Sequence, residues 1–260
     1  MLSPGRKVFY FLVLITIPFL LWIVFGSKIH TLTFFSICLF YLVSRYWKAI
    51  SFFQETIEII FMYLILFYLM DHIGVRKHFP ADIVLIIISM YFFLLYLKKY
   101  NRDTLYLVKG NTKATFGIII LFSLLSIVSL TVWFIFQKEN PHDQFIPGLS
   151  IPILIPLGVG FAMINGFYEE GLFRSILLSH FSKRIGIGWA ILLQSIWFSF
   201  FHYQSGFPSG IAGIGLTFVF GLMMGYLVYR TKGLLIPIII HVLADFSIFL
   251  LIIFRMKNMI

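Results

Sequence analysis

Two neighbouring carboxylates, Glu169 and Glu170, lie in an otherwise apolar stretch and are followed by Arg174. Charged side chains are costly inside a membrane and usually mark a transport pathway or a reactive site. In a helix, Glu170 and Arg174 are four residues apart and share a face, so they can form an ion pair. Glu169 is turned about 100° away and can point elsewhere. We therefore expect Glu169 to be the reactive carboxylate, with Glu170 and Arg174 as its structural support.

Two histidines on later apolar runs complete a set that can activate water. His202 comes one helical turn after Phe198, whose ring would form a wall beside it, and His241 and Asp245 are four residues apart on one face. Glu169 and His202 could take up a proton from water, while His241 and Asp245 stabilise an oxyanion. Alternatively, Glu169, His202 and His241 could hold a divalent metal such as zinc. Both readings predict hydrolysis, and the cofactor stays open between a metal and none.

The composition decides the class of protein that carries these residues. The chain is 60% hydrophobic and only 12% charged, whereas soluble domains are about 25% charged. Several runs approach or exceed the roughly 18 apolar residues that predict a membrane-spanning helix. We therefore predict an all-α, polytopic transmembrane helical bundle of eight to nine spans, with the catalytic core in the last four. Such a chain is a multi-pass protein of the cell membrane, with the lipid bilayer as its first partner.

The apolar runs also predict a division of the chain and an orientation. The last five runs are 114–136, 150–179, 186–203, 209–229 and 234–254. We expect an N-terminal transmembrane scaffold of about five spans in 1–137 and a catalytic core in 150–254. Alternating the loops places thirteen Lys and Arg residues on one side and six on the other. The positive-inside rule makes the richer side, with the amino terminus, cytoplasmic.

The net charge of +10 does not indicate nucleic acid as a partner, because the basic residues lie in short loops between spans. The segment 98–113 is rich in Lys and Arg, and we expect it to be a cytoplasmic loop that faces anionic lipid head groups. Gly221 and Gly225 have the spacing of small residues through which two membrane helices pack closely. Asn165, one turn before Glu169, could contact the site or only a neighbouring helix.

The motifs Glu-Glu-x-x-x-Arg, Phe-x-x-x-His and His-x-x-x-Asp, in this order, resemble the CPBP family. These are the CAAX-prenyl-protease and bacteriocin-processing proteins, also called the Abi family, and the resemblance covers roughly 150–250. It implies an intramembrane endopeptidase with a central cavity and a peptide or protein substrate, such as a prenylated protein or a secreted-peptide precursor. The family is often labelled metalloprotease, while a metal-free glutamate mechanism has also been proposed for its relatives.

The resemblance assigns a role to each motif residue. Glu169 and His202 would activate water, and His241 and Asp245 would line the oxyanion side. Where the prenyl-protease branch carries Asn, this chain has Asp245, and an ionised Asp cannot donate a hydrogen bond to an oxyanion. Asp245 must therefore be protonated, orient His241, or help to bind a cation.

Two other classes of function stay open at this point. Some relatives are linked to bacteriocin self-immunity, so a non-catalytic immunity or interaction protein could use the same fold. A proton- or ion-coupled transporter would also explain buried Glu and His side chains. Inverted repeats between the two halves are typical of such transporters, and the sequence has none that we detect.

Overall fold

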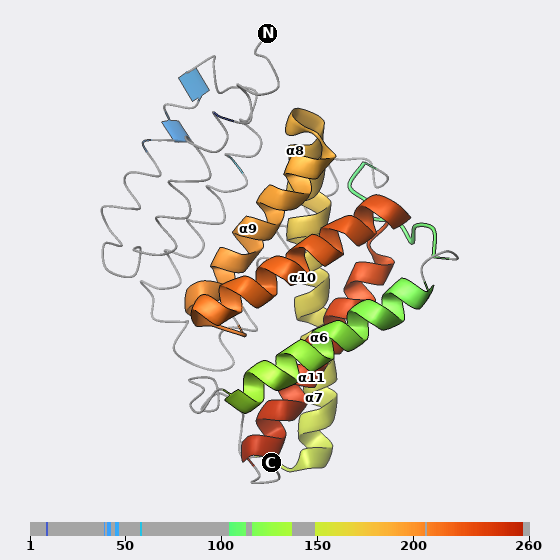
Figure 1. Ribbon diagram of the computed structural model, residues 1–260, viewed down its shortest axis with the longest axis vertical. Helices are drawn as coiled ribbons and strands as arrows, with labels where there is room; N and C mark the ends of the chain where they lie inside the picture. The colour runs from blue at the N-terminus through green and yellow to red at the C-terminus, as the bar shows by residue number, and fades with distance from the viewer. Residues whose placement is uncertain are drawn as a thin grey trace.

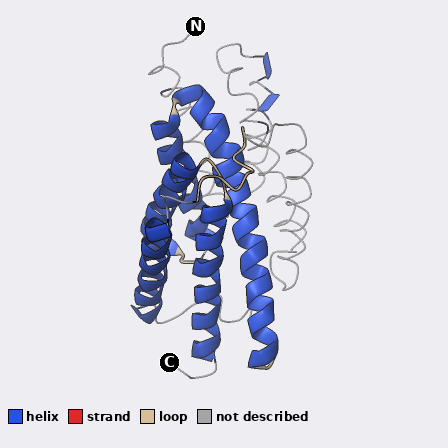
Figure 2. Cartoon of the chain, turned by 90° about the vertical axis from the view of Figure 1, so that its right-hand side faces the viewer, coloured by secondary structure: helices blue, strands red, loops and turns tan. Residues whose placement is uncertain are grey.

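The computed structural model describes residues 104–112, 116–136, 149–205 and 207–256, together with residues 9, 39, 41, 42, 45, 46 and 58. Over these residues the secondary structure is helical and no strand is present (Figure 2). The elements are α6 (Phe116–Phe136), α7 (Ile151–Glu169), the π-helix η5 (Glu170–Leu177), α8 (Leu178–Ile185), α9 (Ile187–Ser205), α10 (Gly210–Thr231) and α11 (Leu235–Met256). The all-α prediction is confirmed here, whereas most of the scaffold expected in 1–137 lies outside the described residues.

Four helical stretches are long and apolar enough to cross a membrane: α6, the continuous helix Ile151–Ile185, α10 and α11. The protein is therefore a membrane protein with several apolar spans. The total of eight to nine spans stays a prediction. Helix α9 falls outside these four, since it carries polar residues such as Gln194, Ser195 and Ser199 along its length.

The predicted run 150–179 is too short, because the helix continues through α8 to Ile185. Polar residues made the run end early in the sequence, yet Ser179 and His180 are buried within the bundle. The last turn of α8 carries Lys183 and Arg184, which favour the negative end of the helix dipole. Gly186 then ends the helix with a φ of +85°, a conformation that glycine adopts readily.

The long helix formed by α7, η5 and α8 runs through the bundle, with α7 at one end and α8 at the other (Figure 1). Helix α11 lies along α7, and α9 lies along α8. Helix α10 packs mainly on α9, while α6 crosses α11. The outer face of α6 exposes large apolar side chains such as Leu121, Leu124 and Val128, as expected for a surface that faces lipid.

The π-helix in the middle of this long helix is buried on all sides. Each of the eight residues of η5 is buried. Part of the cover is the segment 104–112, whose Leu105 is 0% exposed and accepts a hydrogen bond from the Ser175 hydroxyl through its carbonyl oxygen. We expected 98–113 to be a loop facing lipid head groups. Its described part instead packs into the bundle, because Leu105 and its apolar neighbours reach the core between the polar residues.

The same segment is also bound to the turn between α10 and α11. The amide of Asn111 donates to the Thr231 carbonyl at 2.7 Å, and the amide of Leu234 donates to the Val108 carbonyl at 3.1 Å. A β-carbon at Gly233 would lie 2.5 Å from the Val108 oxygen, so this contact requires glycine. The segment therefore fixes the end of the bundle at which α11 begins.

Candidate active site

His241 lies at the centre of the polar group that the sequence predicted. It projects from α11 towards the junction of α7 and η5, where Glu169 is the last residue of one helix and Glu170 the first of the next. The Nδ1 atom of His241 is 2.7 Å from Glu170 Oε1. Its Nε2 atom is 3.4 Å from Glu169 Oε2 and 3.6 Å from Asp245 Oδ1. One imidazole therefore contacts three carboxylates, each within ion-pair distance.

The expected pairing of Glu170 with Arg174 is present, at 3.2 Å between Oε1 and a guanidinium nitrogen, with both side chains 0% exposed. The guanidinium also lies over the ring of Phe198, 4.2 Å from its centroid. From the helical geometry we expected Glu170 to face Arg174 and Glu169 to face the histidines, and this division is wrong. Both carboxylates reach His241, because an imidazole carries nitrogens on two edges and can meet residues that leave a helix about 100° apart.

Exposure separates the two neighbouring carboxylates more clearly than direction does. The Glu169 side chain is 19% exposed and that of Asp245 is 13% exposed, whereas Glu170 is completely buried. Glu170 is held between Arg174 and His241, so it has no room for water or substrate. Of the three carboxylates, Glu169 and Asp245 are the ones whose side chains have exposed surface, although the Glu169 Oε2 atom beside His241 is itself buried.

His202 lies near the carboxyl end of α9 and approaches the site from another side. Its Nδ1 atom is 2.9 Å from the carbonyl oxygen of Phe198, and its ring centroid is 4.5 Å from that of Phe198. Since a carbonyl oxygen only accepts, Nδ1 carries the proton in this contact and Nε2 is left as an acceptor. The polar contacts of Glu169 go to Asn165 and His241, so Glu169 and His202 do not touch directly.

A cavity of about 130 Å³ joins these residues. The ionisable residues of its lining are His202, His241 and Asp245, and the rest of the lining is mainly apolar. The apolar part comes from α6, α10, α11 and the segment before α10, with Leu125, Phe207, Leu216, Phe220 and Ile248 among its residues. The cavity can hold water against two acceptors, the Nε2 atom of His202 and the Asp245 carboxylate, while an apolar group of a substrate occupies its apolar part.

Two kinds of residue at the site carried little or no signal in the sequence, and a third, Asn165, carried a weak one. Phe220 packs edge-on against the His241 ring, with centroids 5.2 Å apart, and an apolar residue of α10 cannot be told from its neighbours by type. Ser126 and Ser129 of α6 line the cavity, although α6 is distant in sequence. Asn165 does contact the site, and its spacing of four residues from Glu169 was the signal for it.

The predicted metal ligands do not assemble into a metal centre in this arrangement. Among the residues that the structure describes, no group of three His, Cys, Asp or Glu side chains is arranged to hold a metal ion. The bond of His241 Nδ1 to Glu170 leaves the Nε2 edge of the ring towards Glu169 and Asp245.

Comparison with known proteins agrees with the motifs. Residues 151–247 match the family model described as "Type II CAAX prenyl endopeptidase Rce1-like". The match begins at the first residue of α7, ends within α11 and contains Glu169, His202, His241 and Asp245. The resemblance to the CPBP family is confirmed over this stretch. No curated protein and no solved structure matches the chain.

Proposed function

We propose that the Rce1-like domain of residues 151–247 is an intramembrane endopeptidase that hydrolyses peptide bonds with water activated by side chains. The observation that carries the proposal is the contact of the Glu169 carboxylate with His241, beside a cavity lined by His202, His241 and Asp245. The substrate is a peptide or protein in the bilayer, and the family description suggests a prenylated carboxyl terminus. We place the protein in the cell membrane with its amino terminus in the cytoplasm.

In the proposed reaction, Glu169 is the general base. It accepts a proton from water while the water oxygen forms a bond to the carbon of the scissile carbonyl, whose electron pair moves to its oxygen. The Nε2 atom of His202 accepts a hydrogen bond from the same water and orients it. When the tetrahedral intermediate collapses, the carbon–nitrogen bond breaks and Glu169 returns the proton to the leaving amine. Protons and electron pairs balance without a further reactant.

The remaining residues act by holding this arrangement. Glu170 accepts the Nδ1 proton of His241 and is itself paired with Arg174, so the ring of His241 keeps its Nε2 edge towards Glu169. A ring with a carboxylate at each nitrogen carries a proton on both nitrogens and has a defined orientation. Phe198 supports Arg174 with its ring and binds His202 through its carbonyl oxygen. The two halves of the site are therefore connected through one residue of α9.

The test uses the full chain reconstituted in liposomes. The probes are a farnesylated peptide with a CAAX terminus, labelled on both sides of the scissile bond, and the same peptide without the lipid. We expect Glu169→Gln and His202→Ala each to lower the cleavage rate by about 10²- to 10⁴-fold, the usual contribution of a general base or its partner. Full cleavage by both variants would refute the assignment.

The matched control makes the same change of glutamate to glutamine outside the domain. Glu58 is half-exposed and lies 3.8 Å from Arg45 in an ion pair remote in sequence from the domain. Glu58→Gln should therefore cleave at the rate of the unaltered protein. Comparison of the two probes decides whether the lipid is required or only the peptide.

A further inference from the structure

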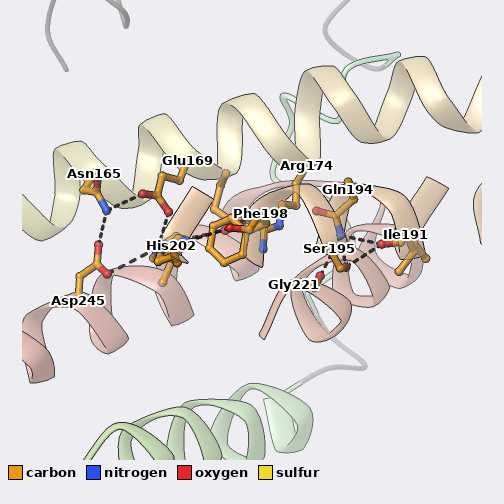
Figure 3. Close-up of polar contacts among 12 residues, drawn as sticks. Asn165, Glu169, Arg174, Ile191, Gln194, Ser195, Phe198, His202, Gly221 and Asp245 are labelled. Carbon is orange, nitrogen blue, oxygen red and sulfur yellow. Dashed lines mark hydrogen bonds and ion pairs between the residues drawn. The ribbon is translucent and has the colours of Figure 1, made fainter. Parts of the chain in front are cut away.

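Asn165 is bonded to two carboxylates from different helices. Its side-chain amide nitrogen donates to Glu169 Oε1 at 3.3 Å, one helical turn away, and to Asp245 Oδ2 of α11 at 3.0 Å (Figure 3). An amide nitrogen has two hydrogens, so both bonds can form at once. The identity of the donor follows from its partners, because two ionised carboxylates can only accept.

The other oxygen of each carboxylate faces a second common donor. Glu169 Oε2 and Asp245 Oδ1 lie 3.4 and 3.6 Å from His241 Nε2. Glu169 and Asp245 are therefore held between the amide of Asn165 on one side and the imidazole of His241 on the other. The four side chains form a closed group across the α7–α11 interface.

Such a pair of carboxylates is not stable without donors. Two like charges a few ångströms apart repel, and the repulsion grows as water is removed from around them. His241 is shared with a third carboxylate, Glu170, at the shorter distance of 2.7 Å. Asn165 is thus the one side chain of the group that is bonded only to Glu169 and Asp245.

A glycine next to Asn165 allows α7 and α11 to approach each other closely. Gly166 follows Asn165, and a β-carbon built on it would lie 3.2 Å from a methyl group of Val242 and 3.5 Å from the β-carbon of His241. A larger residue would separate α7 from α11 by pressing on the segment that carries His241. The short reach of an Asn side chain needs this close approach.

We propose that Asn165 is a positioning residue of the active site, which holds Glu169 and Asp245 as one pair and keeps Asp245 an acceptor. In this arrangement Asp245 orients His241 and does not donate to an oxyanion, so the geometry selects one of the three roles that the sequence left open. Glu169 is held with its reactive oxygen beside His241 and its other oxygen occupied. The inference rests on the proposed function for its effect on catalysis, but the contact itself can be tested without a substrate.

The test exchanges the two partners in the full chain. Asn165→Asp places a third acceptor against Glu169 and Asp245, so we expect kcat for the farnesylated probe to fall by at least about 10²-fold, as for a misplaced catalytic group. KM should change by less than about threefold, because binding in the apolar cavity is untouched. Combining Asn165→Asp with Asp245→Asn restores a donor–acceptor contact between the two positions and should recover part of kcat.

Thermal unfolding in nanodiscs tests the contact independently. It compares the unaltered protein, Asn165→Asp, Asp245→Asn and the double variant. If Asn165 and Asp245 are bonded, the unfolding temperature of the double variant will be higher than the sum of the single shifts predicts. The matched control is Asn111→Asp. The Asn111 side chain is exposed and its bond to Thr231 comes from the backbone amide, so this change should leave kcat unchanged. Wild-type kcat in Asn165→Asp, or strictly additive thermal shifts, would overturn the inference. If the unaltered protein cleaves neither probe, the proposed function fails while the thermal cycle still decides the contact.

Discussion

In the described part of the bundle, the α9–α10 and α7–α11 interfaces each bury a side-chain amide, and the two amides hold different partners. At the α9–α10 interface, the completely buried Gln194 donates to the Gly221 carbonyl at 3.0 Å and to the Ser195 hydroxyl at 2.7 Å. At the α7–α11 interface, the amide of Asn165 donates to two carboxylates (Figure 3). Both use an amide and a glycine backbone, yet one joins neutral groups and the other holds charges.

Access to the cavity is the second difference between the interfaces. The α9–α10 contact is closed, because Gly221 and Gly225 allow the helices to approach until a built β-carbon would meet Ser195 at 3.0 Å and Gln194 at 2.8 Å. The predicted packing role of this glycine pair is confirmed. Near α11, by contrast, His241 and Asp245 line the cavity. The polar groups at the α7–α11 interface are therefore charged and border a cavity, whereas those at the α9–α10 interface are neutral and closed off.

The largest effect that separates the interfaces is expected for His241→Ala. This change removes the common partner of Glu169, Glu170 and Asp245, so the charges of Glu169 and Asp245 lose their only ion-pair partner among the described residues. Breaking a buried ion pair from one side costs about 3–5 kcal/mol of stability. We expect unfolding in nanodiscs at a clearly lower temperature, together with loss of cleavage of the farnesylated probe.

Addition of a second change provides the control for that prediction. His241→Ala combined with Asp245→Asn removes one of the charges that lost its partner, while Glu170 stays paired with Arg174. Part of the stability should therefore return while cleavage stays absent. If His241→Ala alone unfolds like the unaltered protein, the three contacts at this ring do not stabilise the fold and the comparison between the interfaces fails.

Helix positions were largely predictable, because they depend on local properties of the chain. The runs 209–229 and 234–254 correspond to α10 and α11, which end at Thr231 and Met256. A long apolar run between polar or glycine-rich segments has few alternatives to a membrane helix. The pairs at four-residue spacing, Glu170 with Arg174 and Asn165 with Glu169, follow from the same local geometry.

The contacts between helices were not predictable in the same way. Helical spacing says which residues share a face, but the rotation and register of one helix against another depend on packing over its whole length. This is why the central place of His241 and the contact of Asn165 with Asp245, 80 residues apart, emerge only in three dimensions. The π-helix after Glu169 and the packing of Leu105 beneath it have the same origin.

The next effect in size concerns how closely α7 and α11 pack on the amino-terminal side of Asn165. A β-carbon at Gly158 would lie 2.3 Å from the ring of Phe249, whereas one at Gly160 would meet nothing within 4 Å. Gly158→Ala should therefore lower the free energy of unfolding by about 1–3 kcal/mol, as overpacking usually does. Gly160→Ala, two residues along the same helix, should be neutral or slightly stabilising, since alanine favours helix.

Thermal or denaturant unfolding of the two glycine variants in matched nanodiscs measures this difference. A Gly158→Ala, Phe249→Leu double variant should recover stability if the ring is the obstacle. Equal unfolding of Gly158→Ala and Gly160→Ala would show that the α7–α11 interface tolerates a wider spacing than the site geometry requires, and would weaken the argument for a tightly held Asn165–Asp245 contact.

The smallest effect belongs to the closed interface and sharpens the contrast with the first. Gln194→Met keeps the length of the side chain but removes the donor to the Gly221 carbonyl and the Ser195 hydroxyl. A neutral hydrogen bond contributes only about 0.5–1.5 kcal/mol net, so a modest fall in unfolding temperature is expected. The kcat for the farnesylated probe should not change, because Gln194 contacts none of the reacting groups. A loss of kcat that exceeds the loss of stability would mean that α9 and α10 transmit their packing to His202, and the two interfaces would then be parts of one catalytic unit.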